Sequence, residues 1–210
     1  MADVSSYRTL RSEVAAETEI SRSRFLSLLS PVDGEAAARE RIAAVRAAHP
    51  RARHHCTAFV LGPDGALQRT NDDGEPSGTA GAPMLEALVA GGVSDVVAVV
   101  VRYFGGVLLG TGGLTRAYRG AVALALEDAD VAVRTRHTSY ELVAGYAEAA
   151  VVEAEARRAG WPVTATYGAD VGLRVDVPPG GDARLVTSVE RATAGRVAAR
   201  EVGTTWVTTG

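Results

Sequence analysis

Hydrophobic positions recur with two different periods along the first half of the chain. Alternating or continuous apolar runs, bounded by glycine and proline, predict strands over 12–20, 23–32, 54–61, 66–70 and 95–103. Apolar residues at helical spacing predict helices over 35–48, from Thr79 to Gly91 and over 113–128. Pro83 fits the second helix only in its first turn, where the missing N–H has no partner to lose. The predicted buried faces of the first two helices are Ala38, Ile42, Val45 and Ala48, and Met84, Leu85, Leu88 and Val89.

The predicted strand 95–103 is a continuous β-branched run, which is typical of a central strand buried on both faces. It leads into the segment Arg102–Tyr118, where five glycines occur within nine residues ahead of the third predicted helix. Glycine accepts positive φ angles and lets the backbone approach another group closely. This segment is the centre of the functional question.

After residue 136 the order of predicted elements changes. Strand 138–143, helix 148–159, strands 163–167 and 171–177, helix 182–192 and strand 197–207 form a βαββαβ series. We therefore predict an α+β protein with an N-terminal domain over 1–135 and a ferredoxin-like domain over 136–210. Trp161 and Trp206 are expected to pack in the core or at the sheet edge of the second domain.

Composition narrows the class of protein. The net charge is −3, the pI is about 5.8, and no lysine is present among the 22 basic residues, which excludes Schiff-base and P-loop lysine chemistry. Cys56 is the only cysteine, so an internal disulfide is excluded and a reducing compartment is favoured. The first residues do not resemble a signal peptide, and the longest apolar run is far below a membrane span of roughly 20 residues. The expectation is a cytoplasmic protein without a membrane partner.

The glycine segment suits an anion without matching a named nucleotide loop. Thr111 and Gly112 stand where a P-loop requires lysine and a hydroxyl residue, and the dinucleotide fingerprint lacks its third glycine. Free N–H groups at a helix start attract anions, and no acidic residue occurs between Val96 and Leu126. The alternative is a tight turn that needs glycine only for packing. The candidate phosphate or nucleic-acid contacts are Arg102, Tyr103, Phe104, Gly110, Thr111, Gly112, Gly113, Arg116 and Arg119.

Two further motifs contain groups capable of chemistry. Asp72, Asp73 and Glu75 could bind a divalent cation or supply a general base, although aspartate and glycine also favour plain turns and helix caps. The run His54-His55-Cys56 places His54 and Cys56 on one face of a strand and His55 on the other. A partly buried strand is favoured there over a zinc site or a cysteine nucleophile. No cofactor is expected.

The residue patterns resemble the Impact/YigZ family. The resemblance rests on Asn71–Gly81, Val100–Gly106, Leu109–Leu114 and Arg116–Tyr118, with support from Ser23–Phe25 and His49-Pro50, and it covers about residues 5–130. The remainder is similar to the small C-terminal domain of the bacterial members. One departure is His55, where the family pattern has asparagine.

The resemblance implies a ribosomal-protein-S5-domain-2-like N-terminal domain and a ferredoxin-like C-terminal domain. Together they are similar to the last domains of the translocating elongation factor, which implies nucleic-acid or ribosome binding. Eukaryotic members regulate translation initiation through a protein partner held by an additional domain, so that partner is not expected here. No established catalytic activity comes with the family.

Three functional hypotheses follow. The first is a translation-linked protein that binds RNA or the ribosome, with a translation-related protein as a possible further partner. The second is a metal-dependent enzyme acting on a phosphorylated or nucleotide substrate, for which the acidic turn and the glycine segment must meet in space. The third is a protein-docking module that binds no small ligand.

Overall fold

The computed structural model describes residues 4–209, which divide into two compact units at 133/134. The sequence-predicted boundary was 135/136, and its outer limits Met1 and Gly210 lie outside the described residues. No helix in the described part of the chain has the length and apolar character that crossing a membrane demands.

The first unit is built on a five-stranded sheet in which every neighbouring pair is antiparallel. The strand order is β2 (Val14–Ile20), β3 (Ser23–Pro31), β6 (Val96–Tyr103), β4 (His54–Leu61) and β5 (Leu67–Asn71). β6 is the middle strand and is buried from Val96 to Arg102, so the prediction of a central strand covered on both faces is confirmed. A short strand preceding this sheet in the chain, β1 (Ser6–Leu10), was not predicted because it has five residues and no clear alternation.

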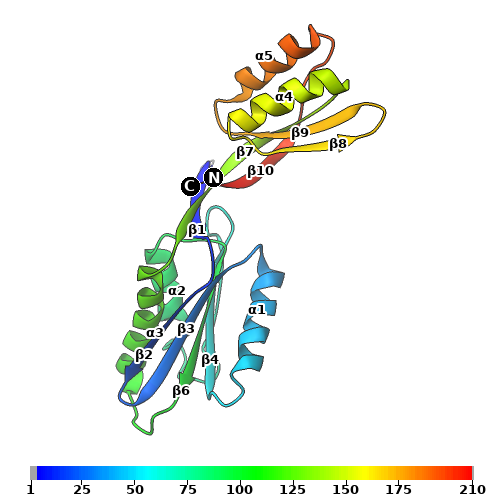
Figure 1. The fold of residues 1–210 in the computed structure, drawn as a ribbon. Helices are drawn as coiled ribbons and strands as arrows, with labels where there is room; N and C mark the ends of the chain where they lie inside the picture. Colours follow the sequence, from blue (N-terminus) through cyan, green and yellow to red (C-terminus); the bar gives the residue numbers. More distant parts are fainter. Residues whose placement is uncertain (1–3, 210) are drawn as a thin grey trace. The chain divides into compact units, whose positions relative to one another are not determined.

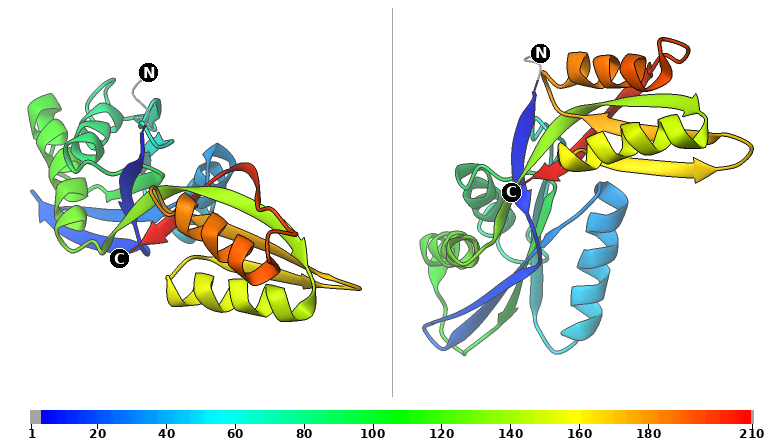
Figure 2. Two further views of the ribbon diagram at one scale, coloured as in Figure 1. Left: turned by 90° about the horizontal axis from the view of Figure 1, so that it is seen from above. Right: turned by 45° about the horizontal axis from the view of Figure 1, so that its top comes forward.

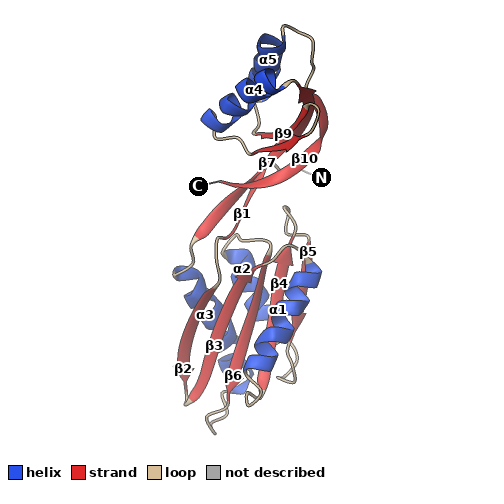
Figure 3. Ribbon diagram, turned by 45° about the vertical axis from the view of Figure 1, so that its right-hand side comes forward, coloured by secondary structure: helices blue, strands red, loops and turns tan. Residues whose placement is uncertain are grey.

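Helices cover both faces of this sheet (Figures 1 and 3). α1 (Glu35–Ala48) packs on one face over a core that includes Phe59 and Val99. α2 (Gly81–Ala90) and α3 (Gly110–Glu127) pack on the other face over a larger core that includes Phe25 and Tyr118. The alternating side chains of the inner strands therefore have apolar partners in both directions.

The second unit has the ferredoxin-like order. Its elements are β7 (Val131–Ala144), α4 (Tyr146–Arg158), β8 (Val163–Tyr167), β9 (Val171–Val177), α5 (Asp182–Thr193) and β10 (Arg200–Thr209). β9 lies between β7 and β8, and β10 pairs with the other side of β7. α4 and α5 lie side by side on one face of this sheet (Figure 2) and enclose a separate apolar core. The predicted α+β class and two-domain layout are confirmed.

Several element boundaries differ from the prediction. α3 begins at Gly110 rather than Gly113, so the last three glycines of the segment form a helical turn instead of a loop. β7 begins seven positions before its predicted start at residue 138. In α2 the buried face contains Ala87, whereas Val89 is 51% exposed. The sequence pattern alone cannot show which of several neighbouring apolar residues of α2 is buried, because the packing partner sets the rotation of the helix about its axis.

Candidate nucleic-acid interface

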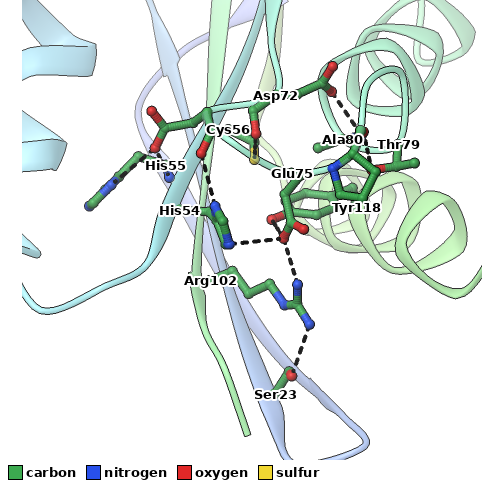
Figure 4. Close-up of polar contacts among 12 residues, drawn as sticks. Ser23, His54, His55, Cys56, Asp72, Glu75, Thr79, Ala80, Arg102 and Tyr118 are labelled. Atoms are coloured by element: carbon green, nitrogen blue, oxygen red, sulfur yellow. Dashed lines mark hydrogen bonds and ion pairs between the residues drawn. The ribbon is translucent and has the colours of Figure 1, made fainter. Parts of the chain in front are cut away.

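The separate sequence motifs meet at one end of the first unit's sheet. Strand register places Arg102 of β6 between Phe25 of β3 and His54 of β4. The segment after β5 brings Glu75 to the same place, and α3 contributes Tyr118 (Figure 4). His54 and Cys56 share one face of β4, as the alternation predicted, and the structure shows that this face is turned toward Glu75 and the α2–α3 core.

Arg102 and Glu75 form a buried ion pair at this end. An Arg102 Nη1 donates to Glu75 Oε1 over 2.6 Å, and the two side chains are 5% and 4% exposed. The Tyr118 hydroxyl donates to the same carboxylate oxygen over 2.8 Å, and His54 Nε2 lies 3.9 Å from it. A charge withdrawn from water is tolerated only with such partners, so Glu75 depends on Arg102 and Tyr118 together.

This arrangement corrects two expectations. Arg102 was predicted to contact phosphate, but its guanidinium is buried against the rings of Phe25 and Phe104, at 5.4 and 5.5 Å from the ring centroids. Glu75 was a candidate metal ligand or second motif, and its carboxylate instead neutralises Arg102. The physical reason is burial: the sequence showed two opposite charges, and only the fold shows that each is the other's counter-ion.

Asp72 and Asp73 also serve the fold. Asp72 accepts backbone N–H bonds from Gly78, Ala80 and Gly81 at 2.8–3.0 Å, which fixes the turn before α2. Partial burial opposes ionisation of this carboxyl, but the three backbone bonds outweigh it and lower its pKa.

Asp73 bonds to the His55 backbone N–H at 2.6 Å and to Arg46 at 2.8 Å. Burial again works against ionisation, and the Arg46 and His55 hydrogen bonds prevail, so the pKa of Asp73 is lowered. Within the part of the chain that the structure describes, no three His, Cys, Asp or Glu side chains gather in a way that could hold a metal ion.

The His54-His55-Cys56 run is an interior strand. Cys56 is fully buried, and its thiol donates to the Asp72 carbonyl at 3.1 Å. Burial raises the pKa of the Cys56 thiol to about 12, with the Glu75 charge adding to the rise, so the sulfur is protonated at neutral pH. Burial likewise raises the pKa of the Tyr118 hydroxyl well above its ordinary value. A protonated, enclosed thiol does not provide a nucleophile.

The glycine turn lies outside this buried network and is exposed. Gly110, Thr111 and Gly112 are exposed in the first turn of α3, where the helix leaves its own N–H groups without internal acceptors. Arg116 is exposed and has no carboxylate partner among residues 4–209, whereas Arg119 pairs with Glu86 at 3.3 Å.

Two further arginines flank the same end of the sheet. Arg53 lies over Phe104 with 5.2 Å between guanidinium carbon and ring centroid, and the Arg102 guanidinium carbon lies 5.5 Å from the same centroid. The Arg22 backbone packs directly against Gly105. A Cβ added at Gly105 would lie only 2.0 Å from the Arg22 carbonyl carbon. Neither arginine has a carboxylate partner among the described residues, and both are exposed. We call Arg22, Arg53, Arg116, Phe104 and the first turn of α3 the arginine end.

Tyr103 differs from its neighbour Phe104. Its hydroxyl contacts His49 Nδ1 at 2.9 Å, and Arg24 covers the ring at 5.5 Å while bonding Glu17. Its predicted stacking face is therefore occupied within the unit. Tyr103 belongs to the support of the arginine end rather than to its open surface.

Sequence reasoning missed several residues that the structure joins to this region. Arg22 and Arg53 were overlooked because they precede their strands and belong to no motif of their own. Ser23 receives hydrogen bonds from Arg102 and from the Gly105 N–H, at 3.4 and 3.2 Å. The available signal was the strand pairing: residues that begin β3 and β4 must lie beside the residues that end antiparallel β6.

Fold and site together define a two-domain α+β protein whose long glycine- and acid-containing motifs assemble one buried charge network. The Impact N-terminal domain family model matches residues 21–126, half of the chain. The chain is 46% identical to the IMPACT family member YigZ of Escherichia coli over 79% of this chain and 82% of that protein. It is also 41% identical to an IMPACT family member of Thermus thermophilus, covering 78% of this chain and 88% of that one. The chain belongs to the IMPACT family.

A solved structure supports the same fold. A crystal structure described as that of a hypothetical protein is 39% identical, has a TM-score of 0.73, and is matched over 94% of this chain and 98% of its own.

Proposed function

We propose that this is a cytoplasmic, translation-linked protein that binds RNA or the ribosome through the arginine end. The proposal keeps the nucleic-acid hypothesis and changes the residues that carry it. Arg22, Arg53 and Arg116 replace the buried Arg102 as phosphate contacts, and the exposed amides of Gly110–Gly112 lie in the same α3 turn as Arg116.

One observation carries the proposal: Arg22, Arg53 and Arg116 are exposed and have no carboxylate partner among the described residues. The Arg22 backbone packs on Gly105, Arg53 lies over Phe104, and Arg116 follows the acid-free start of α3. Basic side chains beside aromatic faces are the combination with which proteins hold single-stranded nucleic acid. Here the half-buried ring of Phe104 lies 5.2 Å from the guanidinium carbon of Arg53 and positions that arginine at the surface. The similarity of both domains to the last domains of an elongation factor supports the ribosome as the source of that RNA.

The test is RNA binding by the variants Arg53→Gln and Arg116→Gln, measured by fluorescence anisotropy with single-stranded RNA and by ribosome co-sedimentation. Three phosphate contacts predict a salt slope of about −2 to −3, and each variant should reduce it by about one. Arg69→Gln, which removes an exposed arginine on another face, is the matched control. Unchanged RNA affinity in the Arg53→Gln, Arg116→Gln double variant would exclude the arginine end.

An exposed apolar loop favours a contact with a protein, such as a ribosomal protein, in addition to RNA. Val107 and Leu108 are 38% and 88% exposed in the loop that precedes α3. An exposed leucine beside a basic surface suits contact with a protein partner. If this hypothesis holds, Leu108→Ser weakens ribosome co-sedimentation but leaves affinity for protein-free RNA unchanged. Equal loss in both assays, or none in either, counts against it.

The metal-dependent enzyme hypothesis receives no such support. Each of the three carboxylates that a metal site would require is hydrogen-bonded within the protein. Asp72 accepts from the start of α2, and Asp73 accepts from Arg46 and from the β4 backbone. Glu75 accepts from Arg102 and Tyr118. Asp72, Asp73 and Glu75 are therefore occupied in holding the fold together.

A further inference from the structure

A groove of about 450 Å³ lies on the first unit's sheet, between α1 and the edge formed by β4 and β5. Its α1 wall presents Arg39, Ile42 and Arg46, and its sheet wall presents Phe59 and Arg69. The register places Arg69 opposite Phe59 and Asn71 opposite Thr57, so these four side chains share the face that α1 covers. None of these residues belongs to the arginine end.

The groove follows from how α1 is seated. Ala38 and Val45 anchor the helix over the middle of the sheet, and β5 is the outermost strand. The exposed Ala43 faces the groove with only a methyl group, which leaves the space beside β5 open. Figure 3 shows α1 laid across this side of the sheet near β4 and β5.

Three arginines and no carboxylate line this space. Arg39 bonds Glu35 and Arg46 bonds Asp73, at 2.5 and 2.8 Å, from positions outside the lining. Among residues 4–209, Arg69 has no carboxylate partner, and its side chain donates to the neighbouring Gln68 carbonyl at 2.9 Å. Because exposed ion pairs contribute at most about 1 kcal/mol, an incoming anion can share these guanidinium groups.

The spacing of the arginines defines the shape of the complementary molecule. Arg39 and Arg46 are seven residues apart on one helix, which corresponds to a rise of about 10 Å. Between them the floor is apolar, with Ile42 half-buried above the buried Phe59. Thr57 and Asn71 add hydrogen-bonding groups on the sheet wall. The volume lies within the range of about 300–1,000 Å³ that is usual for small-ligand clefts.

We propose that this groove binds a small organic polyanion of the size and charge of a nucleoside triphosphate. The arginines bind the phosphoryl groups, and the Ile42–Phe59 floor packs against the organic body. The proposal is independent of RNA binding at the arginine end.

The test is isothermal titration calorimetry of the full chain with ATP, compared with inorganic tripolyphosphate. Arg69→Gln should weaken ATP binding about tenfold, since it removes a charged hydrogen-bond donor. Ala43→Phe, which fills the groove without altering its charge, should abolish binding. ATP should bind more tightly than tripolyphosphate because only ATP has a body to cover the apolar floor.

Arg157→Gln is the matched control, because it removes the same charge from an exposed position of α4 in the second unit and should leave ATP affinity unchanged. Thermal unfolding of each variant verifies that it is folded. Absence of saturable ATP binding at millimolar concentrations, or equal weakening by Arg69→Gln and Arg157→Gln, would overturn the proposal. Equal affinity for ATP and tripolyphosphate would overturn the assignment of an organic ligand. The RNA assay on Arg69→Gln separates this outcome from failure of the proposed function.

Discussion

Arg102 and Glu75 lie 27 positions apart in the chain and form an ion pair of 2.6 Å in which each side chain is about 95% buried. Tyr118 completes this pair with a hydroxyl donated to the same carboxylate oxygen. Three motifs that look like separate functional signals are therefore parts of one structural network. The network holds the ends of β3, β4 and β6 together and leaves the arginine end exposed beside it.

Removing one member of this pair should strongly destabilise the protein. Arg102→Met leaves the Glu75 carboxylate buried without its counter-ion, so we expect a loss of about 3–5 kcal/mol in the free energy of unfolding. Urea denaturation provides the measurement. The double variant Arg102→Met, Glu75→Leu should lose less than the sum of the two single variants.

The same variants distinguish structure from binding. In the folded fraction, Arg102→Met should keep the RNA affinity of the unaltered protein, since its guanidinium is buried away from solvent. If Arg102→Met is as stable as the unaltered protein but no longer binds RNA, Arg102 contacts phosphate and its role is not structural.

Cys56 should be inert while the protein is folded. Its side chain is fully buried and the pKa of its thiol is raised to about 12, so thiolate is scarce at pH values near 8. Iodoacetamide should label it only after unfolding in urea, as followed by intact-protein mass spectrometry. Labelling of the native protein at the rate of a free cysteine would show that the network opens readily.

Gly105 should not tolerate a side chain. A Cβ there would lie 2.0 Å from the Arg22 backbone, so Gly105→Ala must displace the turn between β2 and β3, at a cost of at least about 1–3 kcal/mol. Gly120→Ala is the control: no atom lies within 4 Å of its added Cβ, and it sits inside α3. That change should stabilise the protein by about 1 kcal/mol through helix propensity. Thermal unfolding measures both, and equal effects would contradict the packing argument.

Asp72 should contribute stability in a pH-dependent manner. Its folded-state pKa is below the ordinary 3.8, so its contribution is present above that value and is lost as pH falls through the folded-state pKa. Asp72→Asn removes the charge and one of the two side-chain oxygens that accept from backbone N–H groups, and should lower the free energy of unfolding by about 1–3 kcal/mol at neutral pH. The difference from the unaltered protein should shrink as the pH falls below 3.8 and through the lowered folded-state pKa of Asp72. A difference independent of pH would show that the charge is not involved.

Local patterns predicted much of the first unit's architecture. The β-branched run ending in Arg102 indicated a central strand because no solvated face could accommodate it, and β6 is that strand. Pro83 was placed in the first turn of its helix because it lacks an N–H, and α2 begins two residues before it. The βαββαβ order of the second unit followed from the same kind of evidence.

The roles of individual side chains could not be predicted from the sequence. Arg102, Arg116 and Arg119 are equivalent as sequence, yet one is buried against Glu75, one is exposed and one pairs with Glu86. Arg22 and Arg53 carry no motif, and they became candidates only because antiparallel pairing brings strand starts beside a strand end.

The sequence by itself determined the family and the fold class, since these depend on periodicity, turn chemistry and long motifs. Only the tertiary structure decided which charges are buried and which remain exposed. The reason is physical: a buried charge requires a counter-ion from anywhere in the chain, and sequence separation does not report distance in space. The segment Arg102–Tyr118 is accordingly divided, with its two ends inside the buried network and its glycine turn at the surface.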